Sequence, residues 1–404
     1  MLVKYSHKFN KILYENKIAN ILLLIISIIL LKWINQGRIS QLIIPLFFLC
    51  YFSYLAQSIL LIKKNYFIYI FRAFFMIILC FEIIFGLLNA EKGNTKTIIK
   101  QTGYYDYTVT DSILGWKLKP GCFKQRATRL YNGDTVYDVY YSSDEFSRRI
   151  SEESIKSDTA KNNMNKKHAV FLGCSFTFGQ GLNYSSTFPF LFESMHSEFK
   201  SYNYGFSNYG PQEFCLFFDE GINTINNSTI PEDSGFCIYT YIDDHMNRVY
   251  GGSVYLSNAS TNNSPDIYVN ENKLVRKKRS NFTKYVSWVL NNSETVKYFN
   301  ITTTYPKTVK FYKRFAGIIN YTAEKYWNIK PCGEFYVSLY PDKYCVTDTS
   351  WIKYLNKKIK VLNPPVPIDF ETNQNYKIKN DGHPTKELNL YYVNEFSKSI
   401  FKNK

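Results

Sequence analysis

Three long apolar runs near the amino terminus constrain this chain more than any other feature. They cover Ile18 to Ile34, Leu42 to Ile62 and Phe67 to Leu88. Each run is about 17 to 22 residues long, which is the length a helix needs to cross a bilayer. A cleaved signal peptide would be a single shorter run, so three runs in succession predict a membrane anchor of three transmembrane helices over residues 1–90.

Basic residues around these runs predict the orientation of the anchor. Four lysines precede the first run, Lys32 and Arg38 separate the first two, and two lysines precede the third. Because cytoplasmic segments carry an excess of Lys and Arg, the amino terminus is expected in the cytoplasm. An odd number of spans then predicts a multi-pass protein of the cell membrane, with everything after about residue 90 in a periplasmic or extracellular position.

The formal net charge of +16 does not indicate a nucleic-acid partner. The first 92 residues carry +7 of it, and the remaining +9 is spread over about 310 residues. The one dense basic cluster is KLVRKKRS at 273–280, and no basic stripe interleaved with aromatic residues occurs. The composition therefore favours a solvated surface, or one that faces lipid headgroups, over nucleic-acid contact.

The eight cysteines include no CxxC pair, so neither a metal site nor another cofactor is expected. Cys332 and Cys345 are the candidate disulfide pair in an oxidising compartment. Within the third apolar run, Arg72 and Glu82 are interpreted as contacts between helices rather than a transport site, because three spans are few for a transporter.

Residues 91–165 are expected to be a linker followed by a small β-rich lead-in, because TVYDVYYS alternates as a strand does. From 166 to 404, strands are expected at His168–Leu172, Phe236–Ile242, Phe335–Leu339 and Ile359–Leu362, and helices at Val309–Trp327, Ser350–Lys358 and Lys386–Phe401. This alternation predicts an α/β fold with a parallel sheet flanked by helices. The stretch at about 250–305 is interpreted as an insertion, either a plain cap or a cover whose aromatic rings stack on sugars.

The stretch FLGCSFTFGQG places Ser175 directly after the first of these strands. Reactive groups gather at the carboxyl ends of parallel strands, and Gly173 permits a tight turn beside the serine. Serine is a poor nucleophile alone and needs a base within hydrogen-bond reach. The neighbouring Cys174 is interpreted as buried packing rather than as a thiol nucleophile.

Among the five histidines, His383 is the best candidate for that base. It lies in NDGHPTKELN, with Asp381 two residues upstream. On a strand these side chains would point apart, but Gly382 and the following proline favour a turn in which the carboxylate reaches the imidazole. DGHP alone is also compatible with a capping or turn role. Together with GCSFTFG it predicts a Ser–His–Asp arrangement.

These motifs resemble, in order, the four sequence blocks of the SGNH (GDSL-type) hydrolase family in its membrane-anchored bacterial form, over roughly residues 165–400. The matching stretches are GCSFTFGQG, YNYGFSNYGPQ, IYTYIDDHMNR and DGHP. The resemblance implies a flavodoxin-type three-layer fold, with Ser175 as nucleophile and with Asp381 and His383 as the other triad members. TDSILGWKLKPG and TVYDVYYSSDEFSRR resemble the lead-in of anchored relatives.

Two positions depart from the family pattern of oxyanion-binding or substrate-binding residues. Asn208 stands where the second block usually has a glycine whose amide faces the oxyanion, and Asn tolerates left-handed dihedrals. Asp243 stands where the third block usually supplies an Asn donor, and a carboxylate there would repel the oxyanion unless it is protonated or turned away. His245 and Asn247 are alternative donors, although His245 fits equally well as a surface residue or as a residue that supports the site from behind. In the family that these motifs resemble, the residue that supports the final histidine often lies one position earlier, so Asn380 is an alternative support for His383.

The sequence therefore predicts a membrane-anchored serine esterase, a carboxylic ester hydrolase. Its location and family type point to an acyl ester on an envelope glycan or lipid as the substrate. If a sugar hydroxyl accepted the acyl group, the same residues would make an O-acyltransferase. A catalytically impaired module that binds a glycan or tethers an envelope partner is the alternative from another class. Asp243 favours this alternative, and the intact triad disfavours it.

Overall fold

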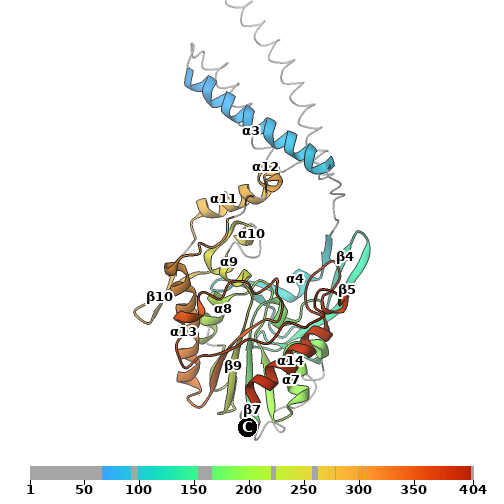
Figure 1. Cartoon of the computed structure of the whole chain (residues 1–404), viewed down its shortest axis with the longest axis vertical. Helices are drawn as coiled ribbons and strands as arrows, with labels where there is room; N and C mark the ends of the chain where they lie inside the picture. The colour runs from blue at the N-terminus through green and yellow to red at the C-terminus, as the bar shows by residue number, and fades with distance from the viewer. Residues whose placement is uncertain are drawn as a thin grey trace, which may run out of the picture. The chain divides into compact units, whose positions relative to one another are not determined.

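A computed structural model describes residues 66–91, 99–152, 166–219, 224–256, 263–277, 279–299, 301 and 303–401 (Figure 1). The chain divides into two compact units. One comprises Met1–Thr97 with Tyr285–Thr302, and the other comprises Ile98–Lys284 with Thr303–Lys404. The first two predicted membrane spans lie outside the described residues.

The first unit contains α3 (Tyr66–Glu91) and α12 (Glu294–Tyr298). The buried Glu82 of α3 accepts hydrogen bonds from Ser293 Oγ and from the backbone amides of Glu294 (2.8 Å) and Thr295 (3.3 Å). A carboxylate is favoured at this place because the first amides of a helix have no partner within it. The interpretation of Glu82 as a contact between helices is confirmed.

The third predicted span, Phe67–Leu88, falls within α3, so a helix does form there. Its sequence includes Arg72 and Glu82, two charged side chains that are costly inside a bilayer. In the part of the chain that the structure describes, no helix has the length and apolar character that crossing a membrane requires. The prediction that Phe67–Leu88 crosses a membrane is therefore not supported.

A nine-stranded sheet forms the centre of the second unit, in the order β1-β4-β5-β6-β8-β7-β9-β12-β13. Its parallel part consists of β8 (Phe199–Asn203), β7 (Lys167–Leu172), β9 (Gly235–Tyr241), β12 (Glu334–Leu339) and β13 (Lys360–Leu362). In chain order this is the 2-1-3-4-5 arrangement of flavodoxin-like folds, whose ligands bind at the switch point between the first and third strands. The predicted parallel α/β sheet is confirmed.

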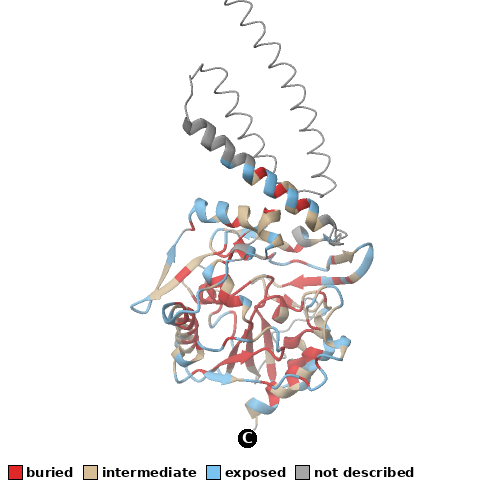
Figure 2. Cartoon of the chain, turned by 45° about the horizontal axis from the view of Figure 1, so that its top comes forward, coloured by how far each residue is buried: buried red, intermediate tan, exposed pale blue. Residues whose placement is uncertain are grey.

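Helices cover both faces of the parallel strands. They are α13 (Val309–Ile329) on one face, and α7 (Phe188–Met195) and α14 (Lys386–Phe401) on the other. Val170 and Leu172 of β7 belong to the apolar cluster on the α13 side. The alternating Ala169 and Phe171 belong to the cluster on the opposite side. Because successive side chains on a strand point to opposite faces, this continuous apolar run contributes to both layers. Figure 2 shows the central strands of the sheet coloured mostly as buried.

The lead-in strands extend the same sheet. They are β1 (Ile99–Thr102), β4 (Gln125–Tyr131), β5 (Asp134–Ser143) and β6 (Arg149–Ile150), with β2 (Thr108–Asp111) and β3 (Gly115–Leu118) forming a separate pair. The four strands pair antiparallel, and Arg149 of β6 lies opposite Asn203 of β8. The β-rich lead-in is confirmed, and its strands are continuous with the parallel sheet.

The remaining elements are shorter or lie in the loops. The helices are α4 (Tyr104–Tyr107), α6 (Ser175–Phe178), α8 (Pro211–Phe214), α9 (Asp244–Tyr250), α10 (Ser253–Leu256) and α11 (Asn281–Asn292). The 3-10 turns are η2 (Tyr184–Ser186), η3 (Cys215–Phe218), η4 (Ile352–Tyr354) and η5 (Gln374–Tyr376). Within the predicted insertion, β10 (Asp266–Asn270) and β11 (Lys273–Lys277) form a hairpin.

Three features differ from the sequence predictions. The expected helix at Ser350–Lys358 is only the turn η4, since Asn356 Oδ1 bonds the amide of Lys358 (3.0 Å) and so competes with helix formation. Strand β8 was not predicted, because FKSYN has only two aromatic residues among polar ones. Cys332 and Cys345 are both free thiols, so the candidate disulfide is not formed.

Candidate active site

Ser175 is the first residue of α6 and lies just beyond the carboxyl end of β7. A Cβ at Gly173 would lie 1.9 Å from Thr177 Oγ1, so the turn into α6 requires glycine. Ser175 is 6 % exposed, and its hydroxyl makes no side-chain hydrogen bond to the residues that the structure describes. The serine therefore occupies the position at which a flavodoxin-like sheet presents reactive groups.

Arg149 of the lead-in binds the backbone of the loop after Ser175. The guanidinium is buried and donates to the carbonyl oxygens of Phe178, Gly179 (2.7 Å) and Leu182. Its plane also lies over the Tyr141 ring, 4.5 Å from the centroid. A single side chain thus satisfies the carbonyls of a loop that has no strand partner, which fixes the course of the chain around the nucleophile.

Asp381 and His383 meet through a turn, as the sequence predicts. Asn380 and Gly382 both have left-handed dihedrals, with φ of 61° and 87°. Asp381 Oδ1 contacts His383 Nδ1 and also accepts the backbone amide of His383 (3.3 Å). Asn380 shows no such contact with His383, so the geometry favours Asp381 as its support.

The carboxylate of Asp381 is enclosed by protein. Its side chain is 0 % exposed, and its second oxygen lies 3.1 Å from Nε of Arg129. Burial raises the pKa of this carboxyl. The hydrogen bond to His383, the charge of His383 and the charge of Arg129 together lower it by more, so the net pKa lies below its usual value. Asp381 is therefore ionised at neutral pH, as a residue that orients an imidazole must be.

The nucleophile loop and the histidine loop meet at Phe176. The Phe176 ring packs edge-on against the His383 imidazole, with centroids 5.5 Å apart, and also against Tyr340, 5.0 Å away. The described structure contains no hydrogen bond between Ser175 Oγ and His383. Catalytic hydrogen bonds are often long in unliganded enzymes and tighten when substrate binds, so this arrangement is compatible with a triad.

Asn208 adopts the left-handed conformation that its position demands, with φ of 64°. Its loop is tied to the nucleophile loop, because the Phe206 amide donates to Gly173 O (3.2 Å) and Ser207 Oγ donates to Gln180 Oε1 (2.8 Å). The described residues offer no hydrogen-bond acceptor to the Asn208 amide. That amide is therefore available as an oxyanion donor, which is the role a glycine would otherwise supply.

Asp243 is committed to other partners. Its carboxylate accepts hydrogen bonds from Tyr241 Oη (2.8 Å), from the amide and hydroxyl of Thr347, and from the amide of Asp348 (3.2 Å). Its own amide donates to Cys345 O (2.7 Å). These contacts fix the loop after β12. The carboxylate is therefore turned toward that loop and Tyr241, where its negative charge is engaged.

His245 is buried in the core, contrary to the surface role considered for it. It is 0 % exposed, and its Nδ1 hydrogen-bonds to Tyr239 Oη (2.7 Å) beneath α9. Burial lowers the pKa of His245 well below its usual value, so the ring is neutral. The second alternative, Asn247, uses its side-chain oxygen to accept the amide of Tyr305 (3.1 Å). Both residues serve the packing of α9.

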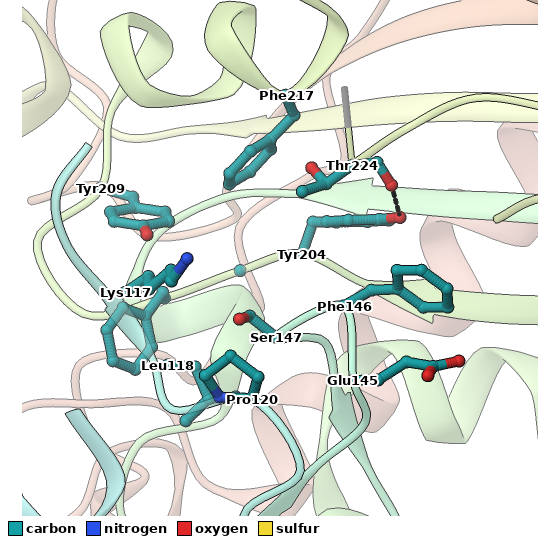
Figure 3. A pocket seen from close by; sticks show the side chains of 12 residues that line it. Lys117, Leu118, Pro120, Glu145, Phe146, Ser147, Tyr204, Tyr209, Phe217 and Thr224 are labelled. Atoms are coloured by element: carbon teal, nitrogen blue, oxygen red, sulfur yellow. Dashed lines mark hydrogen bonds between the residues drawn. The ribbon is translucent and has the colours of Figure 1, made fainter. Parts of the chain in front are cut away.

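Two hollows lie among the loops that carry candidate site residues. One, of about 110 Å³, lies between the lead-in and the loop that carries Asn208, and its wall includes Phe146, Tyr204, Tyr209 and Phe217 (Figure 3). In that view Tyr204 donates to the carbonyl of Thr224 (2.8 Å). The other hollow is open and is lined by residues of the 374–387 segment, Asp381 included. Ser175 and His383 line neither hollow.

Arg129 is the residue at this site that sequence reasoning missed. It lies on β4 of the lead-in, about 250 residues before Asp381 in the chain, and neither motif analysis nor the family resemblance indicated it. Only the pairing of the lead-in strands with the parallel sheet brings it to the histidine turn. No local sequence signal could have identified this contact.

No family model and no curated protein sequence matches the chain. Its fold is similar to that of a protein described as lipolytic and of the G-D-S-L family, from Desulfitobacterium hafniense DCB-2, at 13 % identity and a TM-score of 0.32, covering 58 % of this chain and 99 % of that one. An acetyl xylan esterase from the rumen bacterium Butyrivibrio proteoclasticus matches at 10 % identity and a TM-score of 0.33, covering 58 % of this chain and 64 % of that one.

A third similar structure is a carbohydrate esterase family 2 enzyme with a carbohydrate-binding domain, from Corynascus thermopiles (Myceliophthora fergusii). It matches at 12 % identity and a TM-score of 0.29, covering 59 % of this chain and 66 % of that one. Because all three TM-scores are near 0.3, the functional assignment depends on the residues of this chain.

Glu213 links the stability of the Asn208 loop to pH. This buried carboxyl accepts the amide of Gly210 (2.7 Å) and the hydroxyl of Ser264 (2.7 Å), and burial raises its pKa to about 7. Between the usual Glu pKa and this value, the folded state binds more protons than the unfolded state, so stability falls as pH rises through the window. We expect Glu213→Gln to be about 3 kcal/mol more stable relative to wild type at pH 8 than at pH 4.5.

Chemical denaturation at the two pH values measures this difference. Glu271→Gln, at an exposed carboxylate in the turn between β10 and β11, is the matched control and should show no such change. An equal response of the two variants to pH would contradict the effect expected of Glu213.

Proposed function

We propose that the chain is a serine esterase that hydrolyses an acyl ester. The observation that carries this proposal is the buried Asp381–His383 pair, whose imidazole packs on the residue next to Ser175. A binding module has no need for a buried carboxylate that orients a histidine beside an unbonded serine hydroxyl. The arrangement suits nucleophilic catalysis, in which a base activates a weak hydroxyl nucleophile.

The proposed reaction proceeds through an acyl-enzyme. Ser175 Oγ attacks the ester carbonyl while His383 Nε2 takes the hydroxyl proton, and Asp381 holds the imidazole through Nδ1. The backbone amides of Ser175 and Asn208 stabilise the tetrahedral oxyanion. His383 then gives the proton to the leaving alcohol, and a water molecule, deprotonated by the same imidazole, releases the acid and restores the serine.

The proposed substrate is an acyl group on an envelope glycan or lipid. Support comes from the two apolar runs Ile18–Ile34 and Leu42–Ile62, which are long enough to hold the chain in a membrane, and from the excess of lysines before the first. The position of the hydrolase unit outside the cytoplasm is a separate part of the proposal, because from a cytoplasmic amino terminus it requires an odd number of membrane crossings and these two runs supply two. Membrane fractionation of the full-length chain, with protease treatment of intact and lysed cells, tests the anchoring and the orientation separately.

Turnover of short-chain aryl esters by the purified full-length chain tests the esterase proposal, with acetylated polysaccharide as a second substrate. Release of free acid supports hydrolysis. Transfer of the acyl group to an added sugar, with little free acid, would instead support an O-acyltransferase that uses the same residues. Glycan binding without either reaction would support the catalytically impaired module. Asp243 favours that alternative, because it stands where the third sequence block usually has an Asn that donates to the oxyanion.

A further inference from the structure

We propose that Arg129 of the lead-in is a positioning residue for the triad, because its guanidinium lies against the second oxygen of Asp381 and offsets the negative charge of that carboxylate. This inference rests on the proposed serine esterase function. It makes the lead-in a part of the catalytic site rather than a spacer between anchor and enzyme.

The two oxygens of Asp381 are divided between two partners. Oδ1 faces His383, and Oδ2 lies 3.1 Å from Arg129 Nε. The side chain of Asp381 is 0 % exposed and that of Arg129 is 18 % exposed, so water screens this pair only weakly. Neither Oδ2 nor Nε forms a well-aligned hydrogen bond, so the contact acts mainly through charge.

The lead-in sheet has a feature that directs Arg129 to this place. The register of β4 with β5 shifts between Arg129 and Leu130, as in a β-bulge. A bulge re-aims the side chains around it and is found beside active sites more often than elsewhere. β4 also pairs with β1 on its other side, where Gln101 lies opposite Arg129, so the arginine is held by two neighbouring strands.

The other charged and titratable groups around Asp381 are few among the described residues. His383 comes from its own turn, Tyr137 and Tyr141 come from β5, and Lys377, Lys379 and Glu387 line the same open hollow as Asp381. Burial raises the pKa of Tyr137, Asp381 raises it further and Arg129 lowers it, so this hydroxyl is neutral at ordinary pH. Arg129 is therefore the cation that balances the buried carboxylate when the imidazole is neutral.

The charge of Arg129 should set the pH at which the enzyme becomes active. With Arg129 present, the positive guanidinium offsets part of the negative charge of Asp381, so the carboxylate stabilises the His383 imidazolium less strongly. Without Arg129, the imidazolium is stabilised more strongly, and a higher pH is needed to free the base. The acidic limb of the pH profile of kcat/KM should then move upward.

We expect Arg129→Gln to move this limb by about half a unit to one unit toward higher pH, and to lower kcat about tenfold at the optimum because the carboxylate is less well held. Arg129→Lys should restore the position of the limb, because it keeps the positive charge. Arg126→Gln is the matched control, since Arg126 is on the same strand in an exposed ion pair with Asp138. It should change neither the limb nor kcat.

The pH profiles of the full-length wild type and these three variants decide the inference. An active wild type whose acidic limb is unchanged in Arg129→Gln overturns the role of Arg129 and leaves the esterase proposal intact. Equal losses in Arg129→Gln and Arg126→Gln without a shift of the limb also overturn it, since they indicate a purely structural strand. No turnover in the folded wild type overturns the esterase proposal and this inference with it.

Discussion

Replacing Ser175 by Ala should lower kcat for aryl esters by about 10⁴-fold or more. The hydroxyl is the atom that forms the acyl-enzyme, and removal of a triad nucleophile leaves only the residual catalysis of the oxyanion site and of binding. The fold should be retained, because Ser175 Oγ makes no side-chain hydrogen bond to any described residue and its replacement removes a single oxygen. Turnover measured beside a thermal unfolding curve separates lost chemistry from lost structure.

Cys174→Ala is the matched control for this variant. Cys174 is 1 % exposed and belongs to the apolar cluster on the α7 and α14 side of the sheet, so its loss should cost some stability and little activity. If Cys174→Ala were inactive and Ser175→Ala active, the nucleophile would be the thiol and the proposed mechanism would be wrong.

Replacing Asp381 by Asn should lower kcat by about 10³- to 10⁴-fold. An amide at this position offers no negatively charged acceptor for the hydrogen bond from Nδ1–H, so the imidazole loses the tautomer and orientation that a base needs. The variant should also lose stability, about 3 kcal/mol, because it leaves the largely buried Arg129 without its anionic partner. Steady-state kinetics and chemical denaturation of the same preparation measure both effects.

Asn380→Gly controls for the turn itself. Asn380 has a φ of 61°, which glycine adopts without strain, so this variant should keep the fold and most of the activity. A loss as large as that of Asp381→Asn would assign the support of the histidine to Asn380 instead.

Most of the parallel sheet was predictable because its central strands β7, β9 and β12 are buried on both faces. The run at β7 and the runs at β9 and β12 are continuously apolar, so their period and length identify them without a partner. Strand β8 was not predictable in this way, since its pairing with β7 and β6, rather than its own sequence, makes it a strand. Helix α13 was predictable from its apolar face, whereas Asn356 prevented the helix expected at 350–358.

The candidate site also contains residues that the sequence could indicate and residues that it could not. Ser175, Asp381 and His383 could be proposed from the sequence because each lies in a short motif with a glycine that its turn requires. The left-handed Asn208 also followed from its residue type. The burial of His245 was not predictable, because a sequence does not show that a histidine after two aspartates turns into the core. Arg129 was missed because its contact depends on tertiary strand pairing.

The central claim is that Ser175 is an activated nucleophile, and covalent labelling tests it most directly. The purified full-length chain is treated with a fluorophosphonate probe, and the modified peptide is identified by mass spectrometry. We expect labelling at Ser175 that is abolished in Ser175→Ala and strongly slowed in Asp381→Asn. A folded protein that stays unlabelled, or that is labelled at another residue, would contradict the claim.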